Sequence, residues 1–319
     1  MDAKCSQAEA KCDLTARDDT NAGNKSQIFT PKTRNLSVAH SPDADDLFMY
    51  YALNFGWIST PHLRFESCAQ DIQTLNDAAL QSHFDISAIS FALYPLIAQN
   101  YALLRTGVSF GNGYGPKLIK KSQTHLKQNF KVALSGAHTT NALLFRLAYP
   151  NARIVYKNFL DIESSVLNGE VDAGVLIHES ILEFDSSLVV EAELWDIWED
   201  LSGGGLPLPL GGMAISRSLP LNIALECEDA LTQAVKVAVN NKKILSKMLL
   251  ERNLVRVDSQ KLEVYLNLYA NADSATLSDL QKSAIDRLFA LGFDAGIYAQ
   301  KLLSEDFLLP KNYNSLRYS

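Results

Sequence analysis

Apolar and polar positions along the chain form blocks that predict strands followed by helices. Short apolar runs at residues 36–39, 84–89 and 131–134 have the length of strands. Each run is followed by a stretch with apolar residues at helical spacing. Strands that alternate with helices are typical of α/β proteins with a mostly parallel sheet. We therefore expect an α/β fold from residue 35 onward.

Helix start and stop signals separate these blocks. A Ser-Pro-Asp sequence at residues 41–43 and Gly56 enclose an apolar-rich stretch, which predicts a helix over residues 42–55. Helical spacing continues after residue 220, so we expect a helical C-terminal part. Four shorter stretches also have helical spacing: residues 72–81, 91–99, 141–147 and 162–167.

One predicted strand ends on an ionisable side chain. Residues 171–178 form an apolar run that predicts a buried strand, and its last residue is His178. Strands buried on both faces rarely carry a histidine, except at the carboxyl end, where open α/β sheets bind ligands. The alternative is a core histidine whose ring is satisfied by a backbone carbonyl. This segment alone leaves both interpretations open.

The chain is expected to form two α/β domains. Residues 76–86 and 163–173 resemble each other, which indicates two units of similar build. Glycine-rich stretches at residues 111–116 and 203–212 suit crossings between them. We expect three parts: residues 1–34 as a disordered leader, residues 35–110 plus 218–319 as a discontinuous first α/β domain, and residues 111–217 as a second α/β domain inserted into it.

Composition and charge exclude several classes of partner. The chain has 47% hydrophobic and 20% charged residues, which is ordinary for a globular protein, and a formal charge of −7, which disfavours nucleic acid or an anionic membrane. It lacks an apolar run of roughly 20 residues and the apolar core of a secretory signal. Its four cysteines have no metal-site spacing and suit a reducing compartment. We therefore expect a cytoplasmic protein.

Polar side chains follow the predicted strands. The carboxyl ends of parallel strands share one edge of a sheet, so two facing sheets would line a cleft with these side chains. Helix starts at the same edge offer unpaired N–H groups that suit a carboxylate. For any one Ser or Thr, a simple helix N-cap is the alternative. The residues that follow the strands are Ser41, Ser90, Thr139, Thr140 and His178.

Other site chemistries have weaker support in the sequence. Asp43, Asp45 and Asp46 are possible magnesium ligands, but acids in a first helical turn are favoured by the helix dipole in any case. The histidines have no recognised zinc spacing. The glycine stretches match neither GxGxxG nor the phosphate loop, and GxSxG is absent. We expect no metal and no cofactor.

The order and spacing of five motifs resemble one enzyme family. These motifs resemble those of the 1,4-dihydroxy-6-naphthoate synthases of the futalosine route to menaquinone. The resemblance covers about residues 36–300. The resemblance implies a fold similar to type II periplasmic binding proteins, with the substrate in an interdomain cleft. The motifs are Ser-Pro-Asp-Ala-Asp-Asp at 41–46 with Phe48, residues 111–116, His-Thr-Thr at 138–140, Ile-His-Glu at 177–179 and residues 206–211.

The resemblance also implies a reaction and site residues. The reaction is that of a carbon–carbon lyase, which converts cyclic dehypoxanthinyl futalosine into 1,4-dihydroxy-6-naphthoate and releases a small carbohydrate fragment without a metal or organic cofactor. His178 is the implied general base. Relatives often have alanine at the position of Asn141 and Ser-Pro-Cys-Pro-Asn-Asp in place of the first motif, which leaves the side-chain roles of Asn141 and Asp43 open. Implied substrate contacts are Ala88, Ile89, Ser90, Thr140 and Asn141, in addition to Ser41 and Thr139 from the pattern above.

The chemistry of the residues is compatible with this reaction. Breaking a carbon–carbon bond next to a ketone needs a base, and a histidine with an ordinary pKa of about 6.5 is largely neutral at cytoplasmic pH. The alternatives on the same fold are a solute-binding protein that captures a small carboxylate, a chorismate dehydratase and a regulatory ligand-binding domain. We expect a small-molecule substrate, no nucleic-acid or membrane partner, and a monomer or homodimer.

Overall fold

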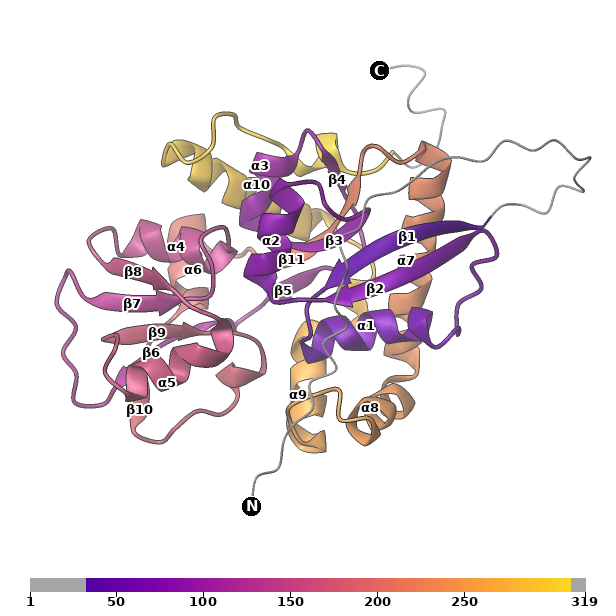
Figure 1. Cartoon of the computed structure of the whole chain (residues 1–319). Helices are drawn as coiled ribbons and strands as arrows, with labels where there is room; N and C mark the ends of the chain where they lie inside the picture. Colours follow the sequence, from indigo (N-terminus) through magenta and orange to yellow (C-terminus); the bar gives the residue numbers. More distant parts are fainter. Residues whose placement is uncertain (1–32, 311–319) are drawn as a thin grey trace, which may run out of the picture.

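Two β-sheets with helices packed on them organise residues 33–310, the part of the chain that this computed structural model describes (Figure 1). The expected leader therefore lies almost wholly outside the described residues. The first sheet has the strand order β2-β1-β3-β11-β4, with β5 paired to β11, and the second has the order β10-β6-β9-β7-β8. This arrangement confirms the expected α/β class.

The first sheet is mixed, whereas the sequence predicted a mostly parallel one. β1 pairs in parallel with β2 and β3, but β11 runs antiparallel to β3, β4 and β5. The reversed strand β11 is the segment by which the chain returns from the second sheet. The strands are β1 (Arg34–His40), β2 (Leu63–Ala69), β3 (Ile86–Ser90), β4 (Tyr101–Leu103), β5 (Ser109–Gly111) and β11 (Leu208–Ser216).

The second sheet is also mixed. β7 pairs in parallel with β8 and β9, and β6 runs antiparallel to β9 and β10. Its strands are β6 (Lys117–Lys121), β7 (Lys131–Leu134), β8 (Arg153–Tyr156), β9 (Ala173–Leu176) and β10 (Leu188–Glu193). Its helices are α4 (Thr140–Ala148), α5 (Ile162–Leu167) and α6 (Leu194–Ser202).

Two details of the sequence prediction need correction here. The expected boundary at residue 217 falls after β11, which belongs to the first sheet, so the chain crosses back before Leu208. Gly203, Gly204 and Gly205 all have positive φ, which only glycine adopts readily, and they turn the chain at the end of α6 before it crosses back. Seven strands were not predicted: β2, β4, β5, β6, β8, β10 and β11. One of them, β2, is an edge strand that buries few of its residues and carries a weak apolar pattern.

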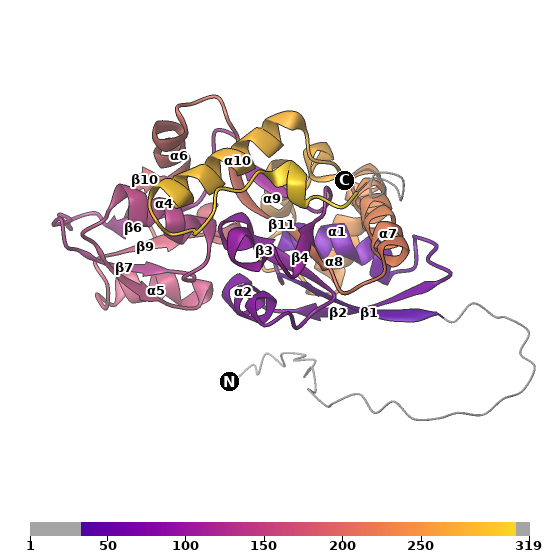
Figure 2. The same cartoon turned by 90° about the horizontal axis from the view of Figure 1, so that it is seen from above.

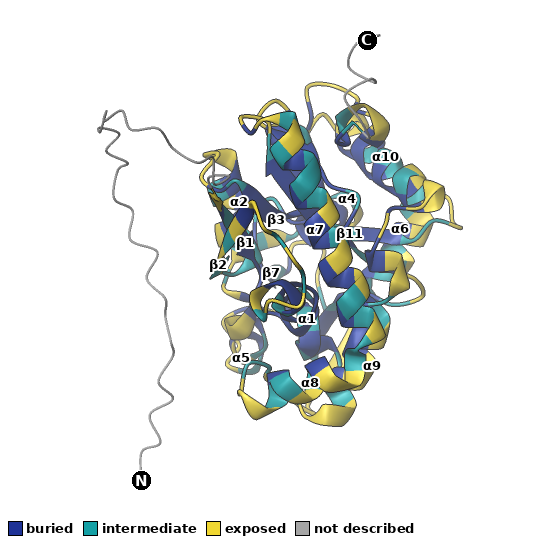
Figure 3. Ribbon diagram, turned by 90° about the vertical axis from the view of Figure 1, so that its right-hand side faces the viewer, coloured by how far each residue is buried: buried dark blue, intermediate teal, exposed yellow. Residues whose placement is uncertain are grey.

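Helices from the C-terminal part cover the first sheet and reach the second. Helix α1 (Ala44–Asn54) packs against α7, α8 and α9, and α10 packs against both β11 and α6, as seen from above in Figure 2. Figure 3 shows that the helices turn their buried faces inward and their exposed residues outward. The other helices are α2 (Ile72–Leu80), α3 (Tyr94–Ile97), α7 (Leu221–Asn240), α8 (Lys242–Glu251), α9 (Ser259–Tyr269) and α10 (Asp279–Asp294).

Short 3₁₀ turns complete the architecture, and one of them matters for the site. Strand β9 ends at Leu176, two residues before the histidine on which the sequence predicted it to end, and His178 begins the turn His178–Ile181. None of the helices within residues 33–310 is both long and apolar enough to cross a membrane. The remaining turns are Phe91–Leu93, Phe159–Asp161, Ala272–Ser274 and Ser304–Phe307.

Candidate active site

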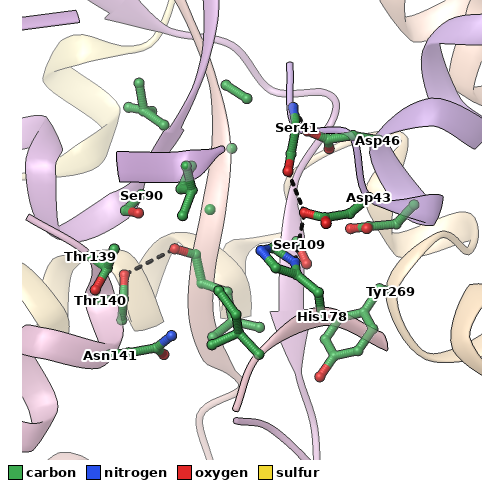
Figure 4. A pocket seen from close by; sticks show the side chains of 18 of the residues that line it. Ser41, Asp43, Asp46, Ser90, Ser109, Thr139, Thr140, Asn141, His178 and Tyr269 are labelled. Atoms are coloured by element: carbon green, nitrogen blue, oxygen red, sulfur yellow. Dashed lines mark hydrogen bonds and ion pairs between the residues drawn. The ribbon is translucent and has the colours of Figure 1, made fainter. Parts of the chain in front are cut away.

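A cavity lies between the two sheets, at the start of α1 on one side and of α4 on the other (Figure 4). It has about 750 Å³ of empty space, counting its open mouth. All eight residues for which the sequence predicted catalysis or substrate contact line it. They are Ser41, Ala88, Ile89, Ser90, Thr139, Thr140, Asn141 and His178. Their contact with a substrate remains a prediction.

His178 has an unusual backbone and an incomplete set of partners. Its φ of 56° lies in the left-handed region, which costs energy for a residue other than glycine and is often found at functional sites. Its Nδ1 lies 2.7 Å from Oδ2 of Asp43. Its Nε2 is buried and has no hydrogen-bond partner within residues 33–310. A buried polar atom without a partner needs an explanation, and a missing ligand is one.

Asp43 is the centre of the charged network around His178. The carboxylate is almost fully buried; its Oδ2 accepts hydrogen bonds from the Ser41 hydroxyl and the His178 ring, and its Oδ1 accepts one from Arg256 at 3.1 Å. Figure 4 shows the chain of contacts from Ser41 through Asp43 to His178. The sequence predicted Asp43 to be an acid of the first helical turn, but its side chain makes no capping bond to α1.

Glu179, which follows a strand of the second sheet, caps α1 in place of Asp43. Its Oε1 accepts a hydrogen bond from the backbone N–H of Ala44 at 2.9 Å. Arg256, from the loop between α8 and α9, lies 3.4 Å from Oε2 of Glu179 and 5.0 Å from the centre of the Phe159 ring. The two sheets are therefore joined by hydrogen bonds and ion pairs beside His178.

The pair of His178 and Asp43 is charged at neutral pH. Burial alone would lower the pKa of His178, but the negative charge of Asp43 and its hydrogen bond outweigh burial and raise that pKa to about 9. Burial likewise opposes ionisation of Asp43, yet His178, Ser41 and Arg256 hold its pKa below the ordinary value. The expectation of a neutral His178 is therefore wrong, because it used the ordinary pKa of a histidine without a carboxylate beside it.

The other two acids of the first motif have raised pKa values. Burial and the charge of Asp43 raise the pKa of Asp45 to about 7, and its Oδ1 accepts a hydrogen bond from the Tyr265 hydroxyl at 3.1 Å. Burial also raises the pKa of Asp46 well above its ordinary value, although it accepts a hydrogen bond from the Ser41 N–H. Among the described residues, no three His, Cys, Asp or Glu side chains are grouped so as to hold a metal ion.

The opposite wall is built from the start of α4 and is uncharged. The Thr139 hydroxyl caps α4 by accepting from the Ala142 N–H at 3.1 Å, and the Thr140 hydroxyl donates to the Leu210 carbonyl at 2.9 Å. The carbonyl oxygen of the buried Asn141 side chain has no partner within the described residues. Both threonine hydroxyls thus have structural bonds, which leaves Asn141 and the first-turn N–H groups of α4 as candidate donors and acceptors.

Sequence reasoning missed several residues that shape this site. Arg256 comes from a loop without any motif, and its contacts join residues 43, 179 and 256, which are distant in sequence. Tyr265 and Tyr269 of α9 also line the cavity. The sequence could indicate a cation at this site only indirectly, because buried carboxylates in the first motif require a cation from elsewhere in the chain.

Comparison with known proteins identifies relatives over most of the chain. A family model described as menaquinone biosynthesis matches residues 36–294. A protein of Thermus thermophilus named 1,4-dihydroxy-6-naphthoate synthase is 29% identical, and the match covers 83% of this chain and 96% of that protein.

Two solved structures show the same fold. A crystal structure of a protein from Archaeoglobus fulgidus has 32% sequence identity and a TM-score of 0.75, and the match covers 82% of this chain and 98% of that one. The alkanesulfonate-binding protein of Xanthomonas axonopodis pv. citri has 16% identity and a TM-score of 0.64, and the match covers 87% and 98% of the two chains. The fold is thus that of periplasmic binding proteins, as the motifs implied.

Proposed function

The chain belongs to the menaquinone biosynthesis family, and from this premise we propose that it converts cyclic dehypoxanthinyl futalosine into 1,4-dihydroxy-6-naphthoate as a carbon–carbon lyase. One observation carries the proposal: His178 lines a cavity between two sheets with one ring nitrogen on Asp43 and the other without a partner in the described chain. A protein that only captures a solute has no need for such a pair.

His178 acts as the general base in this proposal. The Asp43 carboxylate accepts a hydrogen bond from the Nδ1–H group, so the neutral ring carries its lone pair on Nε2, as in other carboxylate–histidine pairs. Because the pKa of His178 is about 9, only about a hundredth of the free protein has a neutral ring at pH 7. The charged ring suits the binding of an anionic substrate, and the rate of proton removal should rise with pH.

The start of α4 supplies the complementary donors. The first two N–H groups of this helix, those of Thr140 and Asn141, have no acceptor within the helix and border the cavity. Together with the positive end of the helix dipole, they suit the substrate carboxylate or the oxyanion that forms when the carbon–carbon bond breaks. Asn141 provides a side-chain amide at the same place.

Turnover of the proposed substrate tests the function directly. The purified protein is incubated with cyclic dehypoxanthinyl futalosine, and formation of the naphthoate is followed by its absorbance. His178→Ala should lower turnover by about 10²- to 10⁴-fold while binding is largely retained. His62→Ala, which removes an exposed histidine outside the cavity, is the matched control and should leave turnover unchanged.

Three results would contradict parts of this proposal. Tight binding without product indicates capture of a solute instead of catalysis. Product from chorismate in place of the cyclic substrate indicates a dehydratase on the same fold. Near-normal turnover by His178→Ala shows that another group removes the proton.

A further inference from the structure

Asp45 is a second ionisable group in the cavity that the pair of Asp43 and His178 does not use. It lies in the first turn of α1, is 7% exposed and borders the same cavity. The Tyr265 hydroxyl, from α9, holds its Oδ1 at 3.1 Å. Its Oδ2 makes no hydrogen bond to any residue between 33 and 310. One oxygen is therefore positioned by the protein while the other remains available to a ligand.

The charges around the cavity indicate that Asp45 can carry a proton. The anions Asp43 and Glu179 are balanced by two cations, His178 and Arg256, at hydrogen-bond distances. Asp45 takes part in none of the ion pairs formed by the described residues. A buried carboxyl group without a cation is stabilised by protonation, so Asp45 is poised to exchange a proton near neutral pH.

We infer that Asp45 is the catalytic acid that protonates the enolate formed when the carbon–carbon bond of the substrate breaks, while His178 acts as the base. The inference rests on the proposed function and assigns the second proton transfer that a lyase of this kind requires. Two groups with different environments in one cavity are the usual arrangement for such an acid–base pair.

Protons and electrons balance in the proposed cleavage of the carbon–carbon bond. His178 Nε2 takes the proton of a substrate hydroxyl, the electron pair of that O–H bond becomes the second bond of a carbonyl, and the adjacent carbon–carbon bond breaks. Its electron pair moves toward the neighbouring ketone and forms an enolate, whose oxygen takes the proton of Asp45. In a ring that becomes aromatic, this enol is a phenol. Proton transfer from His178 to Asp45 then restores both groups, and no oxidant or reductant is consumed.

The titration of Asp45 is coupled to that of its surroundings. The positive charge of His178 lowers the pKa of Asp45, whereas Asp43 and Glu179 raise it, and Asp45 in turn raises the pKa of His178. The groups that interact with this carboxyl are the acids Asp43, Asp46 and Glu179, the cation His178, and the phenols Tyr50, Tyr114, Tyr265 and Tyr269. Arg256 pairs with the neighbouring Asp43.

This coupling predicts the shape of the pH profile. The productive form has a protonated Asp45 and a neutral His178, so it carries one proton fewer than the fully protonated pair. Its population rises through the lower pKa, about 7, and falls through the upper one, about 9. The profile of kcat/KM should therefore be bell-shaped, with its maximum near pH 8.

The experiment compares pH profiles of three proteins between pH 5 and pH 11. Asp45→Asn should lose about 10²- to 10⁴-fold in kcat/KM and also the fall at alkaline pH, because only the deprotonation of His178 then controls the rate. Tyr265→Phe is the matched variant that keeps the carboxyl. It should keep the bell shape and shift the rising limb to higher pH, because the carboxylate loses a hydrogen-bond donor.

The outcomes separate this inference from the function on which it rests. If the unmodified protein forms no naphthoate, the proposed function fails. If it forms naphthoate but Asp45→Asn has the same rate, or a lower rate with an unchanged alkaline fall, Asp45 is not the acid. Should Asp45→Asn not fold, carbon-13 NMR of aspartate-labelled unmodified protein decides: a carboxyl that titrates near pH 7 supports the inference, and none between pH 6 and pH 8 overturns it.

Discussion

Two helices begin at the cavity, and their first turns are completed in different ways. The start of α4 is capped locally, because Thr139 accepts from the N–H of Ala142 three residues later. The start of α1 is capped from the other sheet, because Glu179 accepts from the N–H of Ala44, 135 residues away. The residue at the cap position of α1, Asp43, is thereby left to bind His178 and Arg256.

This difference explains why the start of α4 suits ligand binding, whereas the start of α1 forms part of a reactive site. A local cap satisfies the helix with a neutral hydroxyl and leaves N–H groups for a ligand. A cap from the other sheet brings in a charge, and that charge needs Arg256, so three ionised groups gather beside His178. The reactive pair therefore depends on the two sheets being closed on each other, whereas the start of α4 does not.

The largest effect should come from removing the carboxylate at the start of α1. Asp43→Asn leaves His178 without the acceptor that orients its ring and leaves Arg256 with one anion fewer. We expect turnover to fall by about 10²- to 10⁴-fold, as for other carboxylate–histidine pairs, and the pKa of His178 to fall. Steady-state kinetics measure the loss of turnover, with Asp200→Asn, which changes an exposed acid on α6, as the control. An unchanged rate in Asp43→Asn would contradict a role for Asp43.

The same ion pair should make stability depend on pH. His178 has a folded pKa of about 9 and an ordinary pKa of 6.5, so its contribution to the free energy of unfolding is full below pH 6.5 and disappears as pH rises through 9. The shift corresponds to about 3 kcal/mol. Urea unfolding at pH 6 and pH 10 should show this loss in the unmodified protein and a smaller one in His178→Gln. Equal losses would show that the pair is not formed in solution.

Removing the charge of the cap between the sheets should weaken substrate binding more than chemistry. Glu179→Gln keeps an oxygen for the Ala44 N–H but removes the charge that faces Arg256. We expect KM to rise about tenfold, or about 1.4 kcal/mol, with a smaller change in kcat. Glu183→Gln is the control, because Glu183 makes an exposed ion pair with Lys261 of α9 that should contribute little. Equal effects of both changes would contradict a special role for Glu179.

The smallest effect should come from the local cap. Thr139→Ala removes the acceptor of the Ala142 N–H and should lower the free energy of unfolding by about 1 kcal/mol, and Thr139→Ser should restore most of it. Urea unfolding at pH 7 measures both. If Thr139→Ala lowered turnover as much as Asp43→Asn does, the two helix starts would not differ in their roles.

The elements that the sequence predicted best are those whose signals are local. Strand β7 and helix α5 have the predicted bounds, and all the predicted site residues border one cavity, because the carboxyl ends of strands and the starts of helices can be recognised from neighbouring residues. Strand β2 was missed because it is a polar edge strand, and the boundary at 217 because β11 pairs with strands far away in sequence.

By itself, the sequence determined the α/β class, several of the helices and strands, the motifs of the family and the presence of a histidine after a buried strand, since each depends on residues close together in the chain. Only the tertiary structure decided the charge of His178, the partners of Asp43, the role of Arg256 and the environment of Asp45. These are electrostatic properties of buried groups, and they depend on which charges the closed sheets bring within a few ångströms, which no local pattern specifies.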